Sequence, residues 1–316
     1  MRKVIGIGET VLDIIFKDNQ PTAAVPGGST FNAMISLGRT GVPAMLISET
    51  GDDRVGQFVT DFMARNGVDP SGMRRMPDTK SPLSLAFLNE NNDAEYIFYK
   101  ENATDRPASS IPDIQPGDLV IFGSYYALNP DTRPQVKAVL EEARRQGAVI
   151  YYDVNFRPAH QGEIMKIRPS LMENLELADI VRGSREDFNV LYGLDDAEKV
   201  YSEKIAFYCP NFIFTDSSHP TRIFTSGGLR RDYPVEKTET VSTIGAGDNF
   251  NAGILYGLVK TGITREQLTQ GLSASQWDAI IGEAQQFATA VCKSIYNYVP
   301  EDFARNKRRK DFIYKT

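Results

Sequence analysis

The residues with the clearest chemical potential lie in the segment 241–253, where Gly245, Ala246 and Gly247 lead directly to Asp248. Apolar residues then recur at helical spacing, so the segment predicts a tight turn that opens a helix. The backbone N–H groups of such a turn, backed by the positive end of the helix dipole, form a site for an anion. A carboxylate here suits a general base that takes a proton from a hydroxyl while the N–H groups hold the charge on a phosphate. The plainer alternative is a glycine-rich turn with an acidic residue in the first turn of its helix.

A second group of polar residues lies near the N-terminus. Asp13 interrupts an otherwise apolar, strand-like run over residues 11–16, so it either faces solvent or holds a ligand. Gly27 and Gly28 precede a helical pattern, and adjacent glycines let a ligand approach the backbone closely. Asn32 falls in the first turn of that helix and can both donate and accept hydrogen bonds. An ordinary glycine-rich start to a helix explains the same pattern without a ligand.

The composition narrows the class of protein. The chain of 316 residues carries a formal net charge of −6 and has a pI near 5.2, which argue against nucleic acid as the main partner. The basic run at residues 305–310 is interpreted as a solvated tail. Two distant cysteines, Cys209 and Cys292, indicate neither a disulfide framework nor a zinc site. No apolar run approaches the roughly 20 residues of a membrane span, and the N-terminus lacks a signal-peptide pattern. We therefore expect a cytoplasmic protein without a membrane partner.

Strand-like runs alternate with helical patterns along much of the chain. Strands are expected at residues 3–8, 43–49, 119–122, 149–153, 179–181 and 211–215, and helices at residues 55–66, 133–145, 171–177, 185–192, 248–260, 265–272 and 276–294. Such alternation predicts βαβ units and a mostly parallel sheet with helices on both faces, an α/β fold. Because no linker or repeat marks a boundary, residues 1–316 are expected to form one domain.

Two pieces do not follow this rhythm. Residues 11–16 and 22–25 look like paired strands, and residues 83–89 and 95–101 look like a hairpin around a turn at 91–93. We expect these pieces to form a small projecting sheet, over about residues 11–25 and 82–104. Such a lid would cover a site at the carboxyl ends of the parallel strands and would exclude water from the reaction.

Two motifs and a segment between them carry a resemblance to a known family. They are Pro26-Gly-Gly-x-x-x-Asn32-Ala with Gly51-Asp-Asp-x-x-Gly56, then Asp153-Val-Asn155-Phe-Arg157, then Thr243-x-Gly-Ala-Gly-Asp248-x-Phe-x-Ala-Gly253. The chain resembles the ribokinase-like (PfkB) carbohydrate kinases over nearly its whole length, and the middle segment resembles the fructokinase and 2-keto-3-deoxygluconate kinase branch. The resemblance implies a three-layer sandwich with a β-sheet lid. It also implies transfer of the γ-phosphoryl group of ATP to a sugar hydroxyl, with Mg²⁺.

The resemblance assigns roles on the sugar side of the site. Asp248 would be the base, and Gly245, Ala246 and Gly247 would form the anion hole. Arg157 would lie near the transferred phosphate or an acidic substrate group, since its fork suits either. The residues implied for sugar binding are Asp13, Gly27, Gly28, Asn32, Tyr99, Lys100, Arg157 and Asp248. Lys100 replaces the arginine of a tyrosine–arginine pair, which counts against a sugar-acid substrate.

The nucleotide side departs more from the family pattern. The residues implied for ATP binding are Asn155, Ser184, Asp187, Thr215, Gly245 and Gly247, with Asp187 acting indirectly on the metal. Ser184 and Asp187 stand where the family has asparagine and glutamate, Ser217 replaces a glycine, and Ser242 replaces an aspartate. These departures count against potassium as a further cofactor and put normal ATP affinity in question.

The favoured interpretation is an ATP-dependent sugar kinase acting on a fructose-like ketose. The alternatives are a catalytically weak, sugar-binding pseudokinase, and a sugar-acid or nucleoside kinase of the same fold. Its partners would be the sugar, ATP and a second copy of the chain that pairs through the lid, whose sheet edge would otherwise be exposed.

Overall fold

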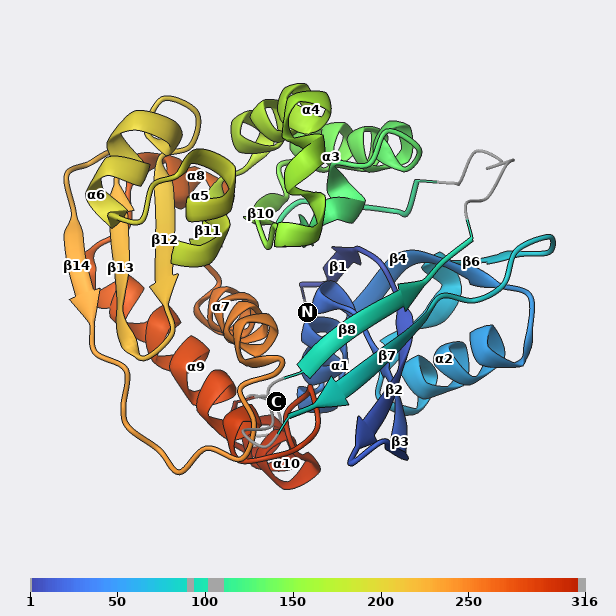
Figure 1. The fold of residues 1–316 in the computed structure, drawn as a ribbon. Helices are drawn as coiled ribbons and strands as arrows, with labels where there is room; N and C mark the ends of the chain where they lie inside the picture. The colour runs from blue at the N-terminus through green and yellow to red at the C-terminus, as the bar shows by residue number, and fades with distance from the viewer. Residues whose placement is uncertain (1, 90–93, 102–110, 312–316) are drawn as a thin grey trace.

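The computed structural model describes residues 2–89, 94–101 and 111–311. The turn expected at residues 91–93 and the last part of the expected lid, residues 102–104, lie outside these ranges. The described chain contains a large central sheet, helices on both of its faces, and a smaller separate sheet (Figure 1). The expected α/β architecture is therefore confirmed.

The central sheet runs in the order β14-β13-β12-β11-β10-β9-β1-β4-β5, and β6 also pairs with β4. The strands from β12 to β5 are parallel, whereas β13 and β14 are antiparallel additions at one edge. Their bounds are β1 Val4–Ile7, β4 Ala44–Gly51, β5 Val68–Asp69, β6 Met73–Met76, β9 Leu119–Gly123, β10 Val149–Asp153, β11 Ile180–Ser184, β12 Asn211–Asp216, β13 His219–Thr225 and β14 Arg230–Tyr233. The inner strands are largely apolar because helices cover both faces, with Asp153 and Arg182 as buried charged exceptions.

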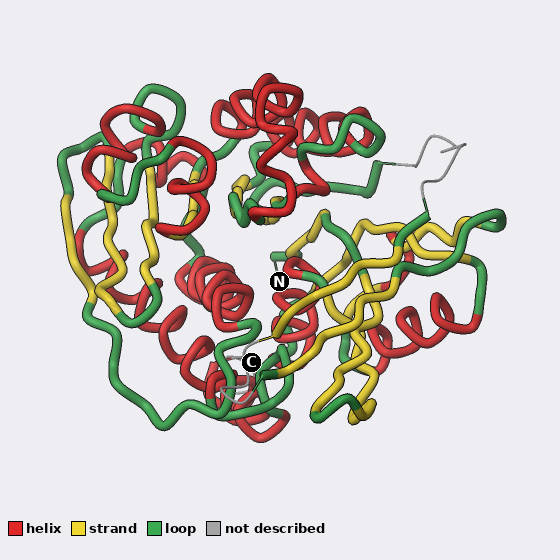
Figure 2. Tube along the Cα trace, viewed as in Figure 1, coloured by secondary structure: helices red, strands yellow, loops and turns green. Residues whose placement is uncertain are grey.

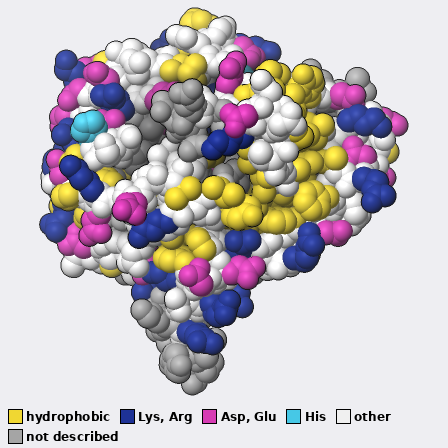
Figure 3. Space-filling view, turned by 60° about the horizontal axis from the view of Figure 1, so that its bottom comes forward, with side chains coloured by type: hydrophobic (Ala, Val, Ile, Leu, Met, Phe, Trp, Pro, Cys, Tyr) yellow, Lys and Arg dark blue, Asp and Glu magenta, His cyan; other side chains and the backbone are white. Residues whose placement is uncertain are grey.

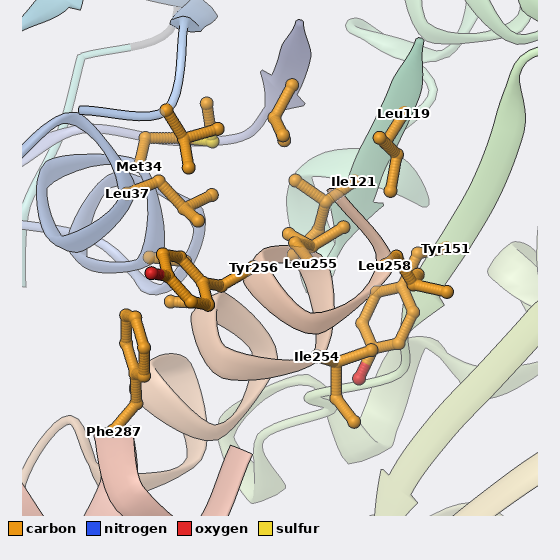
Figure 4. Packing of buried hydrophobic residues seen from close by; sticks show 14 of the residues in the cluster. Met34, Leu37, Leu119, Ile121, Tyr151, Ile254, Leu255, Tyr256, Leu258 and Phe287 are labelled. Carbon is orange, nitrogen blue, oxygen red and sulfur yellow. The ribbon is translucent and has the colours of Figure 1, made fainter. Parts of the chain in front are cut away.

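Two groups of helices bury the two faces of this sheet. One core gathers on the side of α1 (Ser29–Thr40), α2 (Arg54–Arg65), α7 (Ala246–Thr261), α8 (Arg265–Gln270), α9 (Ala274–Cys292) and α10 (Glu301–Asp311). The other gathers on the side of α3 (Arg133–Gln146), α4 (Ile164–Leu177), α5 (Arg185–Tyr192) and α6 (Ala197–Val200). Figure 4 shows Leu255 and Leu258 of α7 directed toward Ile121 and Tyr151 of the sheet. This packing places the start of α7 at the carboxyl ends of the strands.

The smaller sheet runs in the order β3-β2-β7-β8. Its strands are β2 Val11–Lys17, β3 Gln20–Gly27, β7 Leu83–Leu88 and β8 Ala94–Tyr99. It joins two antiparallel pairs through a parallel β2–β7 contact, and Figure 2 shows it as a layer separate from the central sheet. The expectation that the two irregular pieces pair with each other is confirmed.

The C-terminal region corrects one expectation. The basic run at residues 305–310 lies within α10, and it is not a solvated tail. Lys307 is buried and contacts the carboxylate of Glu283, while Arg308 donates to the carbonyl of Arg39 at 2.7 Å. The tertiary pairing with Glu283 explains the error, because composition alone could not reveal a buried partner 24 residues away. In the described ranges, no helix combines the length and the apolar character that crossing a membrane requires.

Candidate active site

The predicted anion turn opens α7. Gly245 is the N-cap residue with φ 77°, a left-handed conformation that favours glycine. A Cβ atom on Gly245 would also lie only 2.9 Å from the carbonyl oxygen of Asn297. The first N–H groups of a helix have no intrahelical acceptor, and a glycine N-cap offers no side chain to satisfy them. Ala246 N donates to the Thr243 carbonyl at 3.2 Å, so the donors that the turn can present to a ligand are the N–H groups of Gly247 and Asp248.

A buried asparagine holds this turn in place. The side-chain amide of Asn249 donates to the carbonyls of Gly245 and Asn297, both at 2.8 Å. Its Oδ1 accepts a hydrogen bond from Ser36 of α1 at 2.5 Å, and the same hydroxyl accepts from Val299 N at 3.0 Å. The start of α7 is thus tied to α1 and to the loop before α10. Sequence reasoning missed Asn249.

Asp248 lies in the first turn of α7 and is half-buried. Asn32 of α1 donates to its Oδ2 at 2.8 Å, across a separation of 216 residues. Burial raises the pKa of Asp248 to about 6, although the Asn32 hydrogen bond and the Arg157 charge lower it. A base with a pKa near the working pH is effective in proton transfer, so this carboxylate is suited to accept a hydroxyl proton.

Asp13 and the two glycines meet on the lid side of the site. Burial raises the pKa of Asp13 to about 6, and a hydrogen bond from the Ser84 hydroxyl opposes this rise. A Cβ atom on Gly27 would lie 2.4 Å from Asp13 Oδ2, and one on Gly28, which has φ 123°, would lie 2.2 Å from the carbonyl oxygen of Glu9. The close approach explains why both positions are glycine.

Strand register decides which lid side chains face the site. Asp13, Ser84 and Phe98 are direct cross-strand partners, so they share one face of the small sheet. Tyr96 is two residues from Phe98, and their rings stack with centroids 5.8 Å apart. Burial raises the pKa of Tyr96 to about 12, and the negative charge of Asp13 raises it further. Tyr96 therefore belongs to the site, and sequence reasoning missed it.

Tyr99 and Lys100 lie differently from what the motif suggests. Tyr99 pairs with Leu83, so it occupies the face opposite Asp13, and 56% of its surface is exposed. Lys100 lies just after β8 and forms an ion pair with Glu9 at 2.5 Å. The pair ties the lid to the end of β1 and offsets the lysine charge.

The second half of the N-terminal signature supports the lid. Asp53 caps α2 by accepting from Gly56 N at 2.9 Å. Its carboxylate also accepts from the backbone N of Ser81 at 2.9 Å and from the Ser81 hydroxyl at 2.6 Å, just before β7 begins. This aspartate therefore anchors the root of the lid strand rather than a ligand.

The segment after β10 carries Asn155 and Arg157. Asn155 adopts φ 34°, an unusual backbone conformation for a residue other than glycine, and Arg157 is exposed. The Arg157 charge lowers the pKa of both Asp248 and Tyr96, although burial dominates the shift of each. The arginine therefore acts electrostatically on the base and on the lid.

Ser184 and Asp187 form a capping box at the start of α5. Asp187 Oδ2 accepts from Ser184 N at 2.6 Å and from Ser184 Oγ at 2.8 Å, and Oδ1 accepts from Phe156 N at 2.7 Å. Burial raises the pKa of Asp187, against the effect of the buried Arg182 charge. Both carboxylate oxygens are thus occupied by protein donors.

An open pocket of about 480 Å³ lies at the carboxyl ends of β11 and β12. It is lined by Ser184, Arg185, Glu186, Asn189, Asp195, Thr215, Asp216 and Ser217. Ser184 and Thr215 are residues that the motif assigns to the nucleotide. Ser217, which stands at the position of a glycine, adopts φ 50°. Ligands of open α/β sheets bind at this end of the strands, so the pocket is the candidate nucleotide site.

Magnesium can be accommodated without a dedicated protein cage. The described residues contain no group of three or more His, Cys, Asp or Glu side chains arranged to hold a metal. Mg²⁺ bound with a nucleotide keeps several waters and needs only one or two carboxylates. Glu186 lines the pocket and could hold the hydrated ion, whereas Asp187 could act on it only through Ser184.

Comparisons with known proteins identify the family. The pattern of the pfkB family carbohydrate kinase matches residues 1–285. The 5-dehydro-2-deoxygluconokinase of Geobacillus thermodenitrificans is 28% identical over 246 residues, which cover 74% of this chain and 72% of that protein. Probable fructokinase-7 of Arabidopsis thaliana is 26% identical over 271 residues, covering 81% of this chain and 78% of that protein.

Solved structures share the fold. The aminoimidazole riboside kinase from Salmonella enterica, complexed with its riboside and an ATP analogue, aligns with a TM-score of 0.83 at 20% identity and covers 98% of this chain and 99% of that one. A fructokinase from Vibrio cholerae O395, bound to fructose, ADP and calcium, aligns with a TM-score of 0.81 at 21% identity. The alignment covers 94% of this chain and 94% of that one.

The described fold is thus the ribokinase-like α/β fold with its small separate sheet. The chain belongs to the pfkB family of carbohydrate kinases, and it is a phosphotransferase that acts on a hydroxyl group.

Proposed function

We propose that this protein transfers the γ-phosphoryl group of ATP to a hydroxyl of a fructose-like ketose, with Asp248 as the general base. The observation that carries the proposal is the Asp248 carboxylate, which has a pKa of about 6 and is hydrogen-bonded to Asn32 beside the glycine turn that opens α7. A hydroxyl held at this carboxylate would lie next to the N–H groups of Gly247 and Asp248, which suits phosphoryl transfer.

In the proposed reaction, the sugar oxygen attacks the γ-phosphorus as Asp248 takes the hydroxyl proton. The bond to the β-phosphate oxygen breaks, and ADP leaves. The turn at Gly245, Ala246 and Gly247 stabilises the charge on the transferring group, and Arg157 adds a positive charge from the opposite loop. When bound with ATP, Mg²⁺ would neutralise part of the phosphate charge.

The sugar would lie between α1 and the lid. Asp13 and Asn32 supply polar groups for its hydroxyls, and the glycine pair leaves room for close approach to the backbone. The ketose preference rests on Lys100, because its ion pair with Glu9 leaves it poorly available to a substrate carboxylate. The named relatives include both fructokinases and sugar-acid kinases, so the choice needs a direct test.

A homodimer through the lid is part of the proposal. Ile97 and Tyr99 are exposed on the face opposite Asp13, and β8 is an edge strand. Figure 3 shows hydrophobic side chains gathered on the side of the molecule that carries the small sheet. Apolar edge strands of this kind are commonly covered by a partner.

A substrate panel tests the proposal. The purified protein, ATP and Mg²⁺ are incubated with ketoses, aldoses, sugar acids and nucleosides, and phosphorylated products are identified by mass spectrometry. A ketose phosphate is the expected product, and the Asp248→Asn variant is the matched control. Binding of a sugar by calorimetry without any product would instead support a sugar-binding protein.

A further inference from the structure

A buried cation lies directly against the anion turn. Arg182 is an inward-facing residue of β11 and is only 7% exposed. A Cβ atom on Gly247 would lie 3.2 Å and 3.5 Å from the two terminal nitrogens of its guanidinium. Nothing in the motifs points to this residue. It is a fixed positive charge behind the candidate phosphate site.

The guanidinium is held by two partners on neighbouring strands. Nη1 donates to Asp153 Oδ1 of β10 at 3.0 Å, and Nη2 donates to Thr215 Oγ1 of β12 at 2.7 Å. Asp153 Oδ2 accepts from Asn251 of α7 at 2.8 Å, so this acid is fully engaged. Nε of Arg182 has no hydrogen-bond partner within the described residues.

These contacts determine the direction of the Thr215 hydroxyl. A threonine hydroxyl has one donor and can accept two hydrogen bonds, whereas a guanidinium only donates. Because Thr215 accepts from Arg182, its own proton must point elsewhere, and Thr215 lines the 480 Å³ pocket. A hydroxyl that donates into this pocket suits an acceptor such as a phosphate oxygen.

A purely structural role explains the geometry less well. A buried ion pair contributes little net stability compared with apolar residues of similar volume, because desolvation offsets the attraction. The Asp153–Arg182 pair alone therefore gives the fold no evident advantage. The third partner, Thr215, lies at the pocket, which points to a function there.

We propose that Arg182 is a positioning residue for the nucleotide phosphates. It orients the Thr215 hydroxyl as a donor toward the phosphate groups and supplies a fixed positive charge behind Gly247. This inference rests on the proposed function, since it takes the pocket beside Thr215 as the nucleotide site.

The test measures ADP affinity by calorimetry in a double-mutant cycle. Thr215→Val removes the hydroxyl and should weaken ADP binding about tenfold, whereas Thr215→Ser should stay within about twofold of the wild type. Arg182→Lys keeps the charge but replaces the two donor nitrogens of the guanidinium, which contact Asp153 and Thr215, with a single ammonium nitrogen, and it should weaken ADP binding to a similar extent. When Thr215→Val is added to Arg182→Lys, ADP affinity should fall by less than about a further twofold, because both changes remove the same interaction. Sugar affinity should stay within about twofold throughout.

The inference is overturned if the losses of ADP affinity in the two single variants add up in the double variant. It is also overturned if ADP and sugar affinity fall equally, because that would indicate a general packing defect. If Arg182→Lys does not fold, the two Thr215 variants decide, and an unchanged ADP affinity in Thr215→Val overturns the inference. The proposed function fails separately. A wild-type protein that binds ADP but phosphorylates no sugar contradicts that function, and the calorimetric cycle still tests Arg182.

Discussion

Two carboxylates in this protein occupy the same position of a helix and have different surroundings. Asp187 is the third residue of α5, and Asp248 is the third residue of α7. The N-cap of α5 is Ser184, whose side chain and backbone exchange hydrogen bonds with Asp187. The N-cap of α7 is Gly245, which has no side chain to exchange. The Asp187 carboxylate is therefore bound by its own helix end and by Phe156 N, whereas Asp248 has no such side-chain cap.

The difference between the two N-cap residues indicates how the start of a helix can hold a reactive carboxylate. The serine N-cap makes the acid part of a capping box, which stabilises the helix and binds Oδ2, while Phe156 N donates to Oδ1. The glycine N-cap leaves the acid and the N–H groups of Gly247 and Asp248 available, and Asn32 supplies a hydrogen bond from a distant helix. Asp248 thus keeps acceptor capacity for a substrate proton beside donors for a phosphate.

The largest expected effect is on turnover and comes from substituting Asp248. Asp248→Asn should lower kcat about 10³-fold, because general base catalysis contributes in this range. Sugar affinity, measured by calorimetry, should change only a few-fold, since the amide preserves the shape. Near-normal turnover would remove Asp248 as the base and would end the contrast with Asp187.

The pH dependence follows from the raised pKa of Asp248, about 6, which burial causes. Below this pH the base is protonated, so kcat/KM should fall about tenfold per pH unit. The effect on stability has the opposite sign. A carboxyl whose pKa is raised on folding contributes stability at pH values below its unfolded pKa, and this contribution is lost as the pH rises through 6.

Thermal melts of the wild type and Asp248→Asn check this sign. At pH 7.5 the variant should melt at the higher temperature, because it no longer has a buried charge. At pH 5 the gap should narrow. A variant that is less stable than the wild type at both pH values would show that the ionised carboxylate is well stabilised in the fold.

The two tyrosines of β8 test the assignment of the lid faces. Tyr96→Ala should raise the KM for the sugar about fivefold, because an aromatic ring that covers a ligand contributes on the order of 1 kcal/mol. Tyr99→Ala should change that KM by less than about twofold in a monomeric sample, because Tyr99 lies on the opposite face of the sheet, the face proposed for dimer contact. Equal effects of both variants on a monomeric sample would contradict the assignment.

Asp187 should contribute mainly to the stability of the fold. Asp187→Ala removes three hydrogen bonds around a buried group and should lower the free energy of unfolding by about 2 kcal/mol. Urea denaturation measures this change, and Asp187→Asn serves as the matched variant that retains part of the network. An unchanged midpoint would mean that the capping box contributes little.

The smallest expected effect concerns Ser217, whose φ of 50° is unfavourable for an L-residue. Ser217→Gly should raise the free energy of unfolding by about 0.5 kcal/mol, since relief of this strain exceeds the added entropy of the unfolded chain. Ser217→Ala, which keeps the strain, is the control. A gain in the alanine variant as well would point to the hydroxyl rather than to the backbone.

Much of this site could be predicted from local pattern. The glycine turn before Asp248 is a short-range signal, because a left-handed N-cap and free N–H groups depend on neighbouring residues. The strand and helix alternation likewise gave the parallel sheet, since the period of apolar residues reports burial directly. The place of Asp13 in a small separate sheet followed from strands that did not fit this alternation.

Other features depend on contacts that local pattern cannot specify. The start of α7 is secured by Asn249 through Ser36 of α1 and Asn297 before α10, and Arg182 contacts Asp153 and Thr215 on the two neighbouring strands. Each of these contacts joins segments that are far apart in the chain. Composition also mistook the helix that contains Lys307 for a tail, because its acidic partner lies on α9.

The sequence by itself determined the glycine turn before Asp248, the residue types proposed for the sugar side and the class of fold, because short-range stereochemistry and apolar periodicity govern them. Only the tertiary structure decided which face of the lid looks into the site. A strand alternates faces at every residue, so Tyr96 and Tyr99 lie on opposite sides once β8 pairs with β7. That register follows from the pairing of β8 with β7 and of β7 with β2, which are distant in the chain, and it places Tyr96 rather than Tyr99 on the face of Asp13.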